Sequence, residues 1–214
     1  MVVPTDNSPA SSSNNSLHPS GNGVIIDIGT GDGHFVYQSA RENPDKFFIG
    51  IDASPKQLAK ISEKIYRKPT KGGAPNVLFI QAAVENLPAE LDGVATEVHV
   101  HFPWGSLLKA VADGDVGVLK QIRRVCASDA LLEVVLGLDP VRDVSEIERL
   151  GLSSITLELI DTKLSTIYSH AGFEITERGI LPASEWPEFK TSWSKKLRGS
   201  RNRSITYLIA RAKS

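Results

Sequence analysis

The stretch that decides the fold is Val24-Ile25-Ile26-Asp27-Ile28-Gly29-Thr30-Gly31-Asp32-Gly33, an apolar run that turns into three glycines at alternate positions. A second apolar run, residues 47–51, is closed by Asp52. Glycines allow a tight turn after a first strand, and an acidic residue that closes the second strand meets ribose hydroxyls in doubly wound α/β folds. The pattern therefore predicts the nucleotide-binding edge of such a fold rather than an ordinary glycine-rich turn.

The glycine spacing indicates which kind of nucleotide is bound. A dinucleotide-binding loop needs glycine at its first, third and sixth positions, but the sixth position counted from Gly29 is His34. The pattern Asp-x-Gly-x-Gly-x-Gly instead resembles motif I of class I S-adenosylmethionine-dependent methyltransferases. S-adenosylmethionine has no pyrophosphate group, so the resemblance implies that the loop does not need the glycine that lets a helix approach a pyrophosphate.

Composition predicts one compact domain of 214 residues, with 41% hydrophobic and 23% charged residues. No apolar stretch is long enough to span a membrane, and no basic-then-apolar signal peptide begins the chain. The single cysteine, Cys126, has no internal disulfide partner, which favours a reducing cytoplasm. Cys126 lies in a helix-like stretch without a histidine partner, so we interpret it as a core residue. We expect a monomer without a membrane partner.

Two parts of the chain differ in character. Residues 1–23, rich in Ser, Asn and Pro, are expected to form a flexible leader, and residues 24–214 a domain that, by its resemblance to motif I, is expected to be the methyltransferase domain. In the domain, strands are predicted at 24–28, 47–51, 77–81, 95–102, 130–136, 173–180 and 204–211, and helices at 33–42, 55–67, 106–125 and 162–171. This alternation predicts a Rossmann-like, mostly parallel seven-stranded sheet covered on both faces, with an antiparallel last strand.

Positive charge is concentrated in two short segments. The net charge is only −1, yet residues 55–75 and 190–214 hold 14 of the 24 lysines and arginines and one of the 25 acidic residues. Phosphate contacts dominate nucleic-acid affinity, so this distribution indicates a polyanion-binding face, although each segment alone is also compatible with a solvated surface. We expect both segments, as basic insertions at about 55–75 and 184–203, to lie near the carboxyl edge of the sheet, beside the cofactor.

Two tryptophans stand in loops rather than in core patterns. Trp104 follows the fourth predicted strand in His-Phe-Pro-Trp-Gly-Ser, and Trp193 lies among cations in Thr-Ser-Trp-Ser-Lys-Lys. An indole in such a loop suits stacking on an unpaired base, which contributes about 1–3 kcal/mol per base. An enzyme that acts on a base in folded RNA must extrude the base and hold it between apolar faces. The two tryptophans are therefore predicted to hold a target base.

The segments Phe-Pro-Trp-Gly-Ser-Leu-Leu and Trp-Ser-Lys-Lys-Leu are distinctive, and with them the chain resembles the aminoglycoside-resistance methyltransferases of the Kam/Npm type. That family modifies N1 of adenine 1408 in the decoding site of 16S rRNA, in the assembled 30S subunit. The resemblance runs collinearly from Val24 to the C-terminus. The matching stretches are 27–33, 49–52, 68–73, 83–88, 102–108, 191–197 and 200–203. The leader departs from the family, whose members carry a structured N-terminal extension.

The resemblance implies a role for each matching residue. Cofactor binding is assigned to Asp27, Gly29, Thr30, Gly31, Asp52, Ala53, Val84, Glu85, Ser106 and Thr191. Ser106 and Thr191 would also line the space between cofactor and base, and Trp104 and Trp193 would sandwich the adenine. RNA phosphates would be bound by Lys64, Arg67, Lys68, Lys71, Lys196, Arg198, Arg201 and Arg203.

The chemistry needs little from side chains, because adenine N1 already carries an in-plane lone pair. We expect catalysis by positioning, with stacking that favours the cationic methylated base. His99 and His101 share one face of a strand, but two ligands are a weak metal signal, and no metal is predicted.

Three alternatives stay open from the residues. The Phe-Pro-Trp loop and the stretch 43–50 also resemble tRNA guanine-N7 methyltransferases, which usually have an acidic residue beside their Phe-Pro segment, where this chain has Gly105-Ser106. A non-catalytic RNA-binding or ribosome-assembly module on the same fold is disfavoured by the intact glycine loop with Asp52. A small-molecule methyltransferase would leave the basic segments without a purpose.

Overall fold

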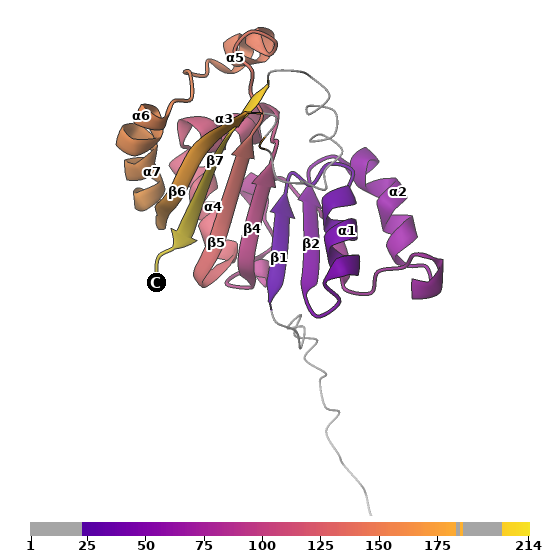
Figure 1. Cartoon of the computed structure of the whole chain (residues 1–214). Coiled ribbons are helices and arrows are strands. Elements are labelled where there is room, and N and C mark those ends of the chain that lie inside the picture. Colours follow the sequence, from indigo (N-terminus) through magenta and orange to yellow (C-terminus); the bar gives the residue numbers. More distant parts are fainter. Residues whose placement is uncertain (1–22, 183–184, 186–202) are drawn as a thin grey trace, which may run out of the picture.

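A computed structural model describes residues 23–182, residue 185 and residues 203–214. Its centre is one seven-stranded sheet with the order β3-β2-β1-β4-β5-β7-β6 (Figure 1). The strands are β1 Val24–Ile28, β2 Phe47–Asp52, β3 Val77–Gln81, β4 Ala95–His101, β5 Cys126–Leu136, β6 Phe173–Pro182 and β7 Ser204–Ala212. All neighbours are parallel except β7, which runs antiparallel to both β5 and β6. The predicted fold class and the antiparallel finish are confirmed.

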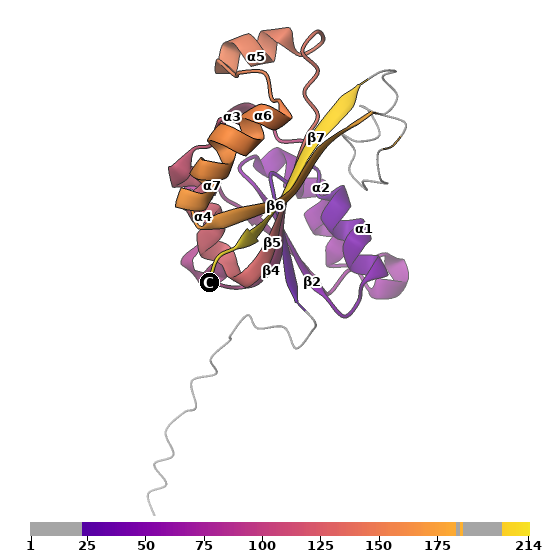
Figure 2. The same ribbon diagram turned by 60° about the vertical axis from the view of Figure 1, so that its left-hand side comes forward.

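Helices cover both faces of the sheet, which Figure 2 shows nearly edge-on. The helices α1 His34–Glu42 and α2 Pro55–Ile65 pack on one face over β1 to β3, where Val36, Tyr37 and Ile61 are buried. On the other face lie α3 Gly105–Asp113, α4 Val116–Val125, α6 Leu157–Leu159 and α7 Ser165–His170, with the π-helical turn Ile160–Leu164 between the last two. A further helix, α5 Val144–Leu150, lies beyond the carboxyl ends of the strands (Figure 1).

Three short 3₁₀ turns complete the described elements: η1 Pro69–Lys71, η2 Val84–Asn86 and η3 Ala89–Leu91. Within the described part of the chain, no helix is long and apolar enough to cross a bilayer. The leader 1–22 lies outside the described residues, so its predicted flexibility stays a prediction.

The helix predicted over 106–125 is in fact two helices, α3 and α4. Gly114, at φ 84°, ends α3 in a left-handed conformation that favours glycine. Asp115 then caps α4, since its side chain accepts a hydrogen bond from the Val118 backbone N–H at 3.0 Å. A glycine followed by a capping aspartate ends one helix and begins the next. This local signal determines the structure here, although the apolar periodicity continues across both helices.

Cys126 is the first residue of β5 rather than part of a helix. The strand starts earlier than predicted because residues 126–129 extend it past an irregularity at Asp129, whose φ is 59°. Cys126 is buried as expected, and burial raises the pKa of its thiol to about 12. A thiol that stays protonated at neutral pH is not a nucleophile.

Candidate active site

The glycine loop joins β1 to α1 and is bound to the end of β2. The backbone N–H groups of Gly29 and Thr30 both donate to the Ile51 carbonyl oxygen, at 2.8 and 3.0 Å. Gly29 has a φ of 76°, and a Cβ atom there would lie 2.7 Å from a methyl carbon of Leu107. A side chain at this position is thus excluded both by backbone strain and by contact.

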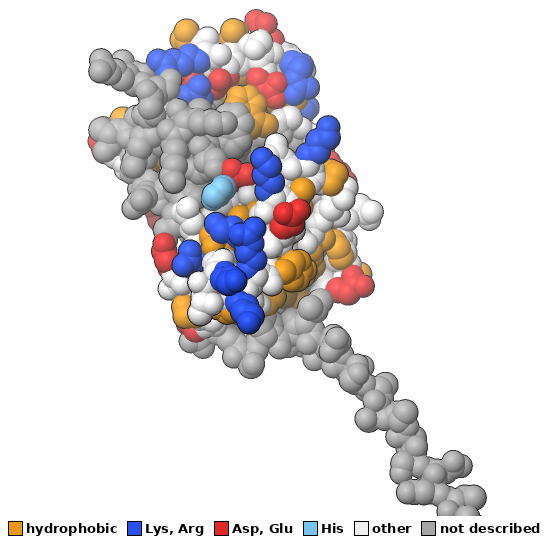
Figure 3. Space-filling model, turned by 90° about the vertical axis from the view of Figure 1, so that its right-hand side faces the viewer, with side chains coloured by type: hydrophobic (Ala, Val, Ile, Leu, Met, Phe, Trp, Pro, Cys, Tyr) orange, Lys and Arg blue, Asp and Glu red, His pale blue; other side chains and the backbone are white. Residues whose placement is uncertain are grey.

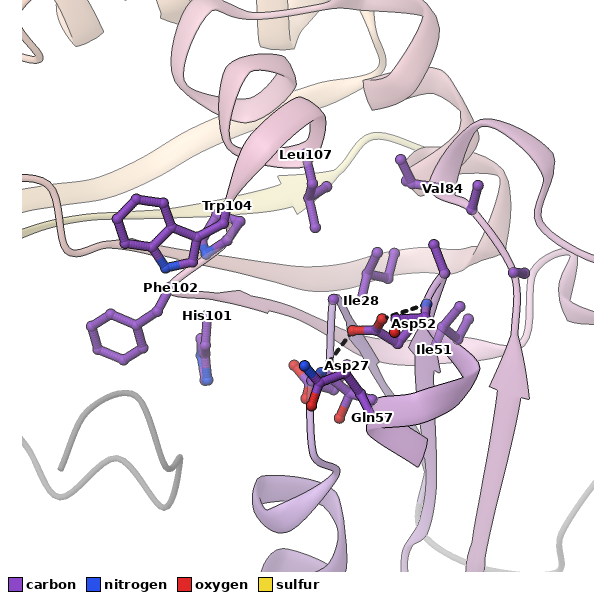
Figure 4. Close-up of a pocket in the computed structure, with 18 of the residues that line it drawn as sticks. Asp27, Ile28, Ile51, Asp52, Gln57, Val84, His101, Phe102, Trp104 and Leu107 are labelled. Atoms are coloured by element: carbon purple, nitrogen blue, oxygen red, sulfur yellow. Dashed lines mark hydrogen bonds between the residues drawn. The ribbon is translucent and has the colours of Figure 1, made fainter. Parts of the chain in front are cut away.

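Asp52 at the end of β2 connects the loop to the start of α2. One carboxylate oxygen accepts from the Gly31 N–H and the other from the Ser54 N–H, both at 2.8 Å (Figure 4). A carboxylate offers about four acceptor positions. Asp52 therefore fixes the loop and retains acceptor capacity for hydroxyl groups in the adjoining cavity.

Asp27, in the middle of this wall, is 3% exposed. Burial raises the pKa of its carboxyl above the usual range, and the positive charge of a protonated His101 opposes that rise. A positively charged ligand in the cavity would stabilise the ionised form of the Asp27 carboxyl.

The loop, the strand ends and the start of α3 enclose one cavity of about 480 Å³. Figure 4 shows Trp104 and Val84 on opposite sides of it. The predicted residues that line it are Asp27, Gly29, Thr30, Gly31, Asp52, Ala53, Val84, Glu85, Trp104 and Ser106. Thr191 and Trp193 lie outside the described residues.

Several lining residues escaped the sequence analysis, among them Gln57, Phe35 and Leu107. Gln57 lies in the first turn of α2, shortly after the carboxyl end of β2. Ligands of open α/β sheets bind at the carboxyl ends of the strands, so this position in the sequence could have indicated a binding role. Leu107 belongs to the distinctive Phe-Pro-Trp-Gly-Ser-Leu-Leu segment and packs against the glycine loop.

The residues of this cavity fit S-adenosylmethionine. Gly31 lines the wall, and a Cβ atom there would meet no protein atom within 4 Å, so the glycine leaves space open beside the loop. The Asp52 carboxylate suits a ribose, the apolar side chains of Val84 and Leu107 suit a purine face, and the Asp27 carboxylate suits an ammonium group. Together they match the three parts of that cofactor.

The loop that carries Trp104 is strained and firmly held. Phe102 has a φ of 50°, which is rare for a large residue, and is 4% exposed. Its N–H donates to the Val135 carbonyl oxygen at 2.8 Å, and its ring packs with Val135 and Ile205. Strained backbone of this kind persists where the surroundings determine it, and it occurs often at functional sites. It directs the chain so that Trp104 enters the cavity wall.

A cluster of titratable groups lies on the same face of the sheet as Asp27. The His101 Nε2 atom lies 2.5 Å from Glu133 Oε1, and the His99 Nδ1 atom lies 3.3 Å from His101 Nε2. Burial alone would raise the pKa of Glu133, but the hydrogen bond and charge of His101 and the charge of His99 hold it below its usual range. The pKa of Glu97 is lowered to about 2, chiefly by its hydrogen bond with His99 and also by Lys46. The sequence showed the two histidines but not Glu133, which β5 brings beside them.

The first basic segment runs away from the cavity, contrary to the prediction that it lies at the carboxyl edge. The helix α2 starts there, but β3 begins with Val77 paired to Phe48 near the start of β2, so the chain has crossed to the amino edge by then. Arg67, Lys68 and Lys71 are exposed on this end of the molecule, and Figure 3 shows basic side chains gathered on that face. A helix that follows a parallel strand returns to the opposite edge before the next strand, which explains the difference.

Two residues of the predicted RNA surface have partners in the protein. The Lys64 ammonium lies 4.1 Å from the centre of the Tyr37 ring, a cation–π contact, and its side chain is half-buried. Arg203 is 5% exposed, and its guanidinium is paired with the Asp143 carboxylate at 2.7 Å and bonded to the Gly137 carbonyl oxygen. A buried, paired guanidinium does not face solvent, so the structure does not place Arg203 on an RNA-binding surface. Lys196, Arg198 and Arg201 lie outside the described residues.

The sheet order and the glycine-loop cavity define a class I S-adenosylmethionine-dependent methyltransferase. The profile of the 16S rRNA (adenine(1408)-N(1))-methyltransferase family NpmA matches residues 10–212. The chain therefore belongs to that family.

Individual relatives agree with this assignment. A 16S rRNA (adenine(1408)-N(1))-methyltransferase of Streptoalloteichus hindustanus is 38% identical over 184 residues, 84% of this chain and 82% of the relative. The crystal structure of the aminoglycoside resistance methyltransferase NpmB1 is 44% identical with a TM-score of 0.78, over 91% of this chain and 89% of the other. A point mutant of the 16S rRNA (adenine(1408)-N(1))-methyltransferase from Catenulisporales acidiphilia, crystallised with the cosubstrate SAM, is 30% identical with a TM-score of 0.82, over 91% and 88%.

Proposed function

We propose that the protein transfers the methyl group of S-adenosylmethionine to N1 of adenine 1408 in 16S rRNA of the assembled 30S subunit, and so protects the cell from aminoglycosides. The observation that carries the proposal is the single cavity shared by the glycine loop, Asp52 and Trp104. It combines a nucleoside-binding wall with an indole able to stack on a base. The activity given in the names of the family and of its relatives supports the same reaction.

The cofactor is held by groups of the β1–β2 edge. In this proposal Asp52 accepts hydrogen bonds from the ribose hydroxyls, and Ala53 lies beside it in the wall. Val84 and Glu85 border the adenine ring, while Asp27 and the loop 29–31 hold the methionine part. When bound, S-adenosylmethionine supplies a methyl group on a positively charged sulfur, ready for attack by a nucleophile.

The target base needs orientation rather than deprotonation. Adenine N1 has an in-plane lone pair, so the protein has to place N1 in line with the methyl–sulfur bond, which is catalysis by proximity and orientation. Trp104 forms one stacking face, and Trp193 is proposed to form the other. Ser106 and Thr191 line the space between base and cofactor. The electron-rich indoles also stabilise the methylated adenine, which carries a positive charge.

The RNA is held through its phosphates over an extended surface. Arg67, Lys68 and Lys71, which follow α2, are exposed and so can meet a phosphate backbone, whereas Lys64 is half-buried against the Tyr37 ring and offers only part of its side chain. The proposed set is Lys64, Arg67, Lys68, Lys71, Lys196, Arg198 and Arg201. Arg203 is left out because its guanidinium is buried against Asp143.

The proposal is tested by primer extension on 16S rRNA from cells that express the protein. A methyl group on adenine N1 blocks Watson–Crick pairing, so reverse transcription should stop next to position 1408, and the cells should survive aminoglycosides. Transfer of tritiated methyl groups to purified 30S subunits and to naked 16S rRNA tests the substrate form. A stop at another nucleotide, or equal labelling of naked RNA, would contradict the base or the particle respectively.

A further inference from the structure

Three metal-ligating side chains converge on one face of the sheet. His99 and His101 alternate along β4 and so point to the same face, and Glu133 on β5 is paired directly with His99 in the register. The His99 Nδ1 atom lies 3.3 Å from His101 Nε2 and 3.7 Å from Glu133 Oε1. His101 Nε2 and Glu133 Oε1 are 2.5 Å apart. The donor atoms of all three residues lie within 4.8 Å of one another.

These separations suit a tetrahedral ion. Zinc binds imidazole nitrogen and carboxylate oxygen at about 2.0–2.2 Å, so two ligand atoms at tetrahedral angles lie about 3.3 Å apart. Two of the three observed separations are close to this value. The third is a short hydrogen bond, which would lengthen when an ion replaces the shared proton. Two histidines and a glutamate are also a known zinc ligand set that leaves the fourth position to water.

The groups around the cluster orient it as they do in metal sites. The other ring nitrogen of His99, Nε2, faces a Glu97 carboxylate oxygen at 3.5 Å, and Glu97 is bound in turn by Lys46 at 3.2 Å. A carboxylate on the outer nitrogen fixes the tautomer of a metal-bound histidine and makes it a better donor. This arrangement leaves His99 Nδ1 directed at His101 and Glu133.

The cluster packs against an aromatic ring on one side and is partly exposed on the other. The Phe35 ring packs against both imidazoles, with centroid distances of 5.3 Å to His99 and 5.0 Å to His101. The His101 side chain is 3% exposed, whereas Glu133 is 26% exposed, which gives an ion a path of entry among the described residues. His101 also lines the cofactor cavity, so the cluster adjoins that cavity through His101.

We propose that His99, His101 and Glu133 form a binding site for one divalent transition-metal ion of the zinc type, with water as the fourth ligand. Methyl transfer to adenine N1 needs no metal, so the proposed ion takes no part in that step, although His101 borders the cavity. An ion there would join β4 to β5 behind the cofactor pocket and add positive charge near Asp27, whose partner in the register is His99. The competing explanation is a cluster held by hydrogen bonds alone.

The test uses tag-free, chelator-treated full-length protein titrated with Co²⁺, and then with Zn²⁺ in competition. We expect one equivalent of Co²⁺ to produce the intense visible absorption of a tetrahedral site and Zn²⁺ to abolish it. Zinc should also raise the unfolding temperature, because it binds the folded state. The variants His99→Ala and Glu133→Gln should lose the absorption, and Glu97→Gln should weaken affinity by about 10- to 100-fold.

The matched control is His170→Ala, which removes an exposed histidine on α7 and should leave the affinity unchanged. Circular dichroism and S-adenosylmethionine binding check that the variants are folded. Absorption typical of octahedral Co²⁺, or uptake that is equal in wild type and His99→Ala, would overturn the proposal. An unfolding temperature of the wild-type protein that does not respond to zinc would also overturn it, without need of any variant.

Discussion

The two halves of the sheet build their parts of the site by different means. In the β1–β3 half, backbone N–H groups hold the glycine loop in place, because they donate to the Ile51 carbonyl and to the Asp52 carboxylate. In the β4–β7 half, side chains hold irregular loops in place, through the Phe102 ring and the Arg203–Asp143 ion pair. A backbone-built site needs glycines at set positions, whereas a side-chain-built site depends on partners far apart in the sequence.

The largest effect is expected where the side-chain-built half loses its buried charge pair. The change Arg203→Ala leaves the Asp143 carboxylate buried without its guanidinium, which should lower the free energy of unfolding by about 3–5 kcal/mol. Urea denaturation measures it. The control Arg211→Ala removes an exposed arginine of β7, the strand that follows Arg203, and should cost less than about 1 kcal/mol. Equal losses in the two variants would show that the pair does not hold this half together.

In the β1–β3 half, the backbone N–H groups of Gly31 and Ser54 depend on one side chain, the Asp52 carboxylate, as their acceptor. The change Asp52→Ala removes the observed acceptor of the Gly31 and Ser54 N–H groups and the proposed acceptor of the ribose, so S-adenosylmethionine affinity should fall more than about tenfold, from a loss of about 1.5–3 kcal/mol. Isothermal titration calorimetry measures the affinity. Asp45→Ala, an exposed aspartate before the start of the same strand, serves as control. Unchanged cofactor affinity in Asp52→Ala would refute the role assigned to this carboxylate.

Trp104 separates base capture from both cofactor binding and docking. The change Trp104→Ala removes one stacking face, worth about 1–3 kcal/mol, so methyl transfer to 30S subunits should fall roughly 5- to 150-fold. Binding to the subunit should stay close to normal, since every cation proposed to bind phosphate is still present. Trp104→Phe should retain part of the activity because a smaller ring still stacks. If Trp104→Ala methylates at the wild-type rate, the base is held elsewhere.

The smallest effect is expected on the exposed cations at the amino edge. The double change Lys68→Glu with Lys71→Glu should weaken 30S binding and lower the slope of log affinity against log salt by about one unit for each phosphate that is no longer neutralised. Filter binding at several salt concentrations measures this slope. Lys120→Glu, on α4 at the opposite face of the sheet, is the control. An unaltered slope in the double variant means that these lysines are only solvated.

Those parts of the fold that local sequence pattern determines could be predicted from the sequence. The alternation of strand-like and helix-like stretches predicted the seven strands, and the glycine spacing with Asp52 predicted that the glycine loop and the end of β2 meet at one edge of the sheet, because these signals depend on near neighbours. Glu133 was missed because the pairing of β4 with β5 decides which residue lies beside His99. Arg203 was misplaced because it stands in a basic run, and its partner Asp143 is 60 residues away. Such long-range pairings are not written in spacing or composition.

The position of β7 has a consequence for how the molecule is completed during synthesis. The last strand of the chain lies inside the sheet, between β5 and β6, rather than at its edge. β6 therefore has no strand to join until residues 204–212 have left the ribosome, and β5 keeps an open edge for the same time. Without residues 204–212, β6 would lose its partner strand and β5 would remain joined to the sheet through β4 alone, so the attachment of β6 depends on a strand that follows it in the chain.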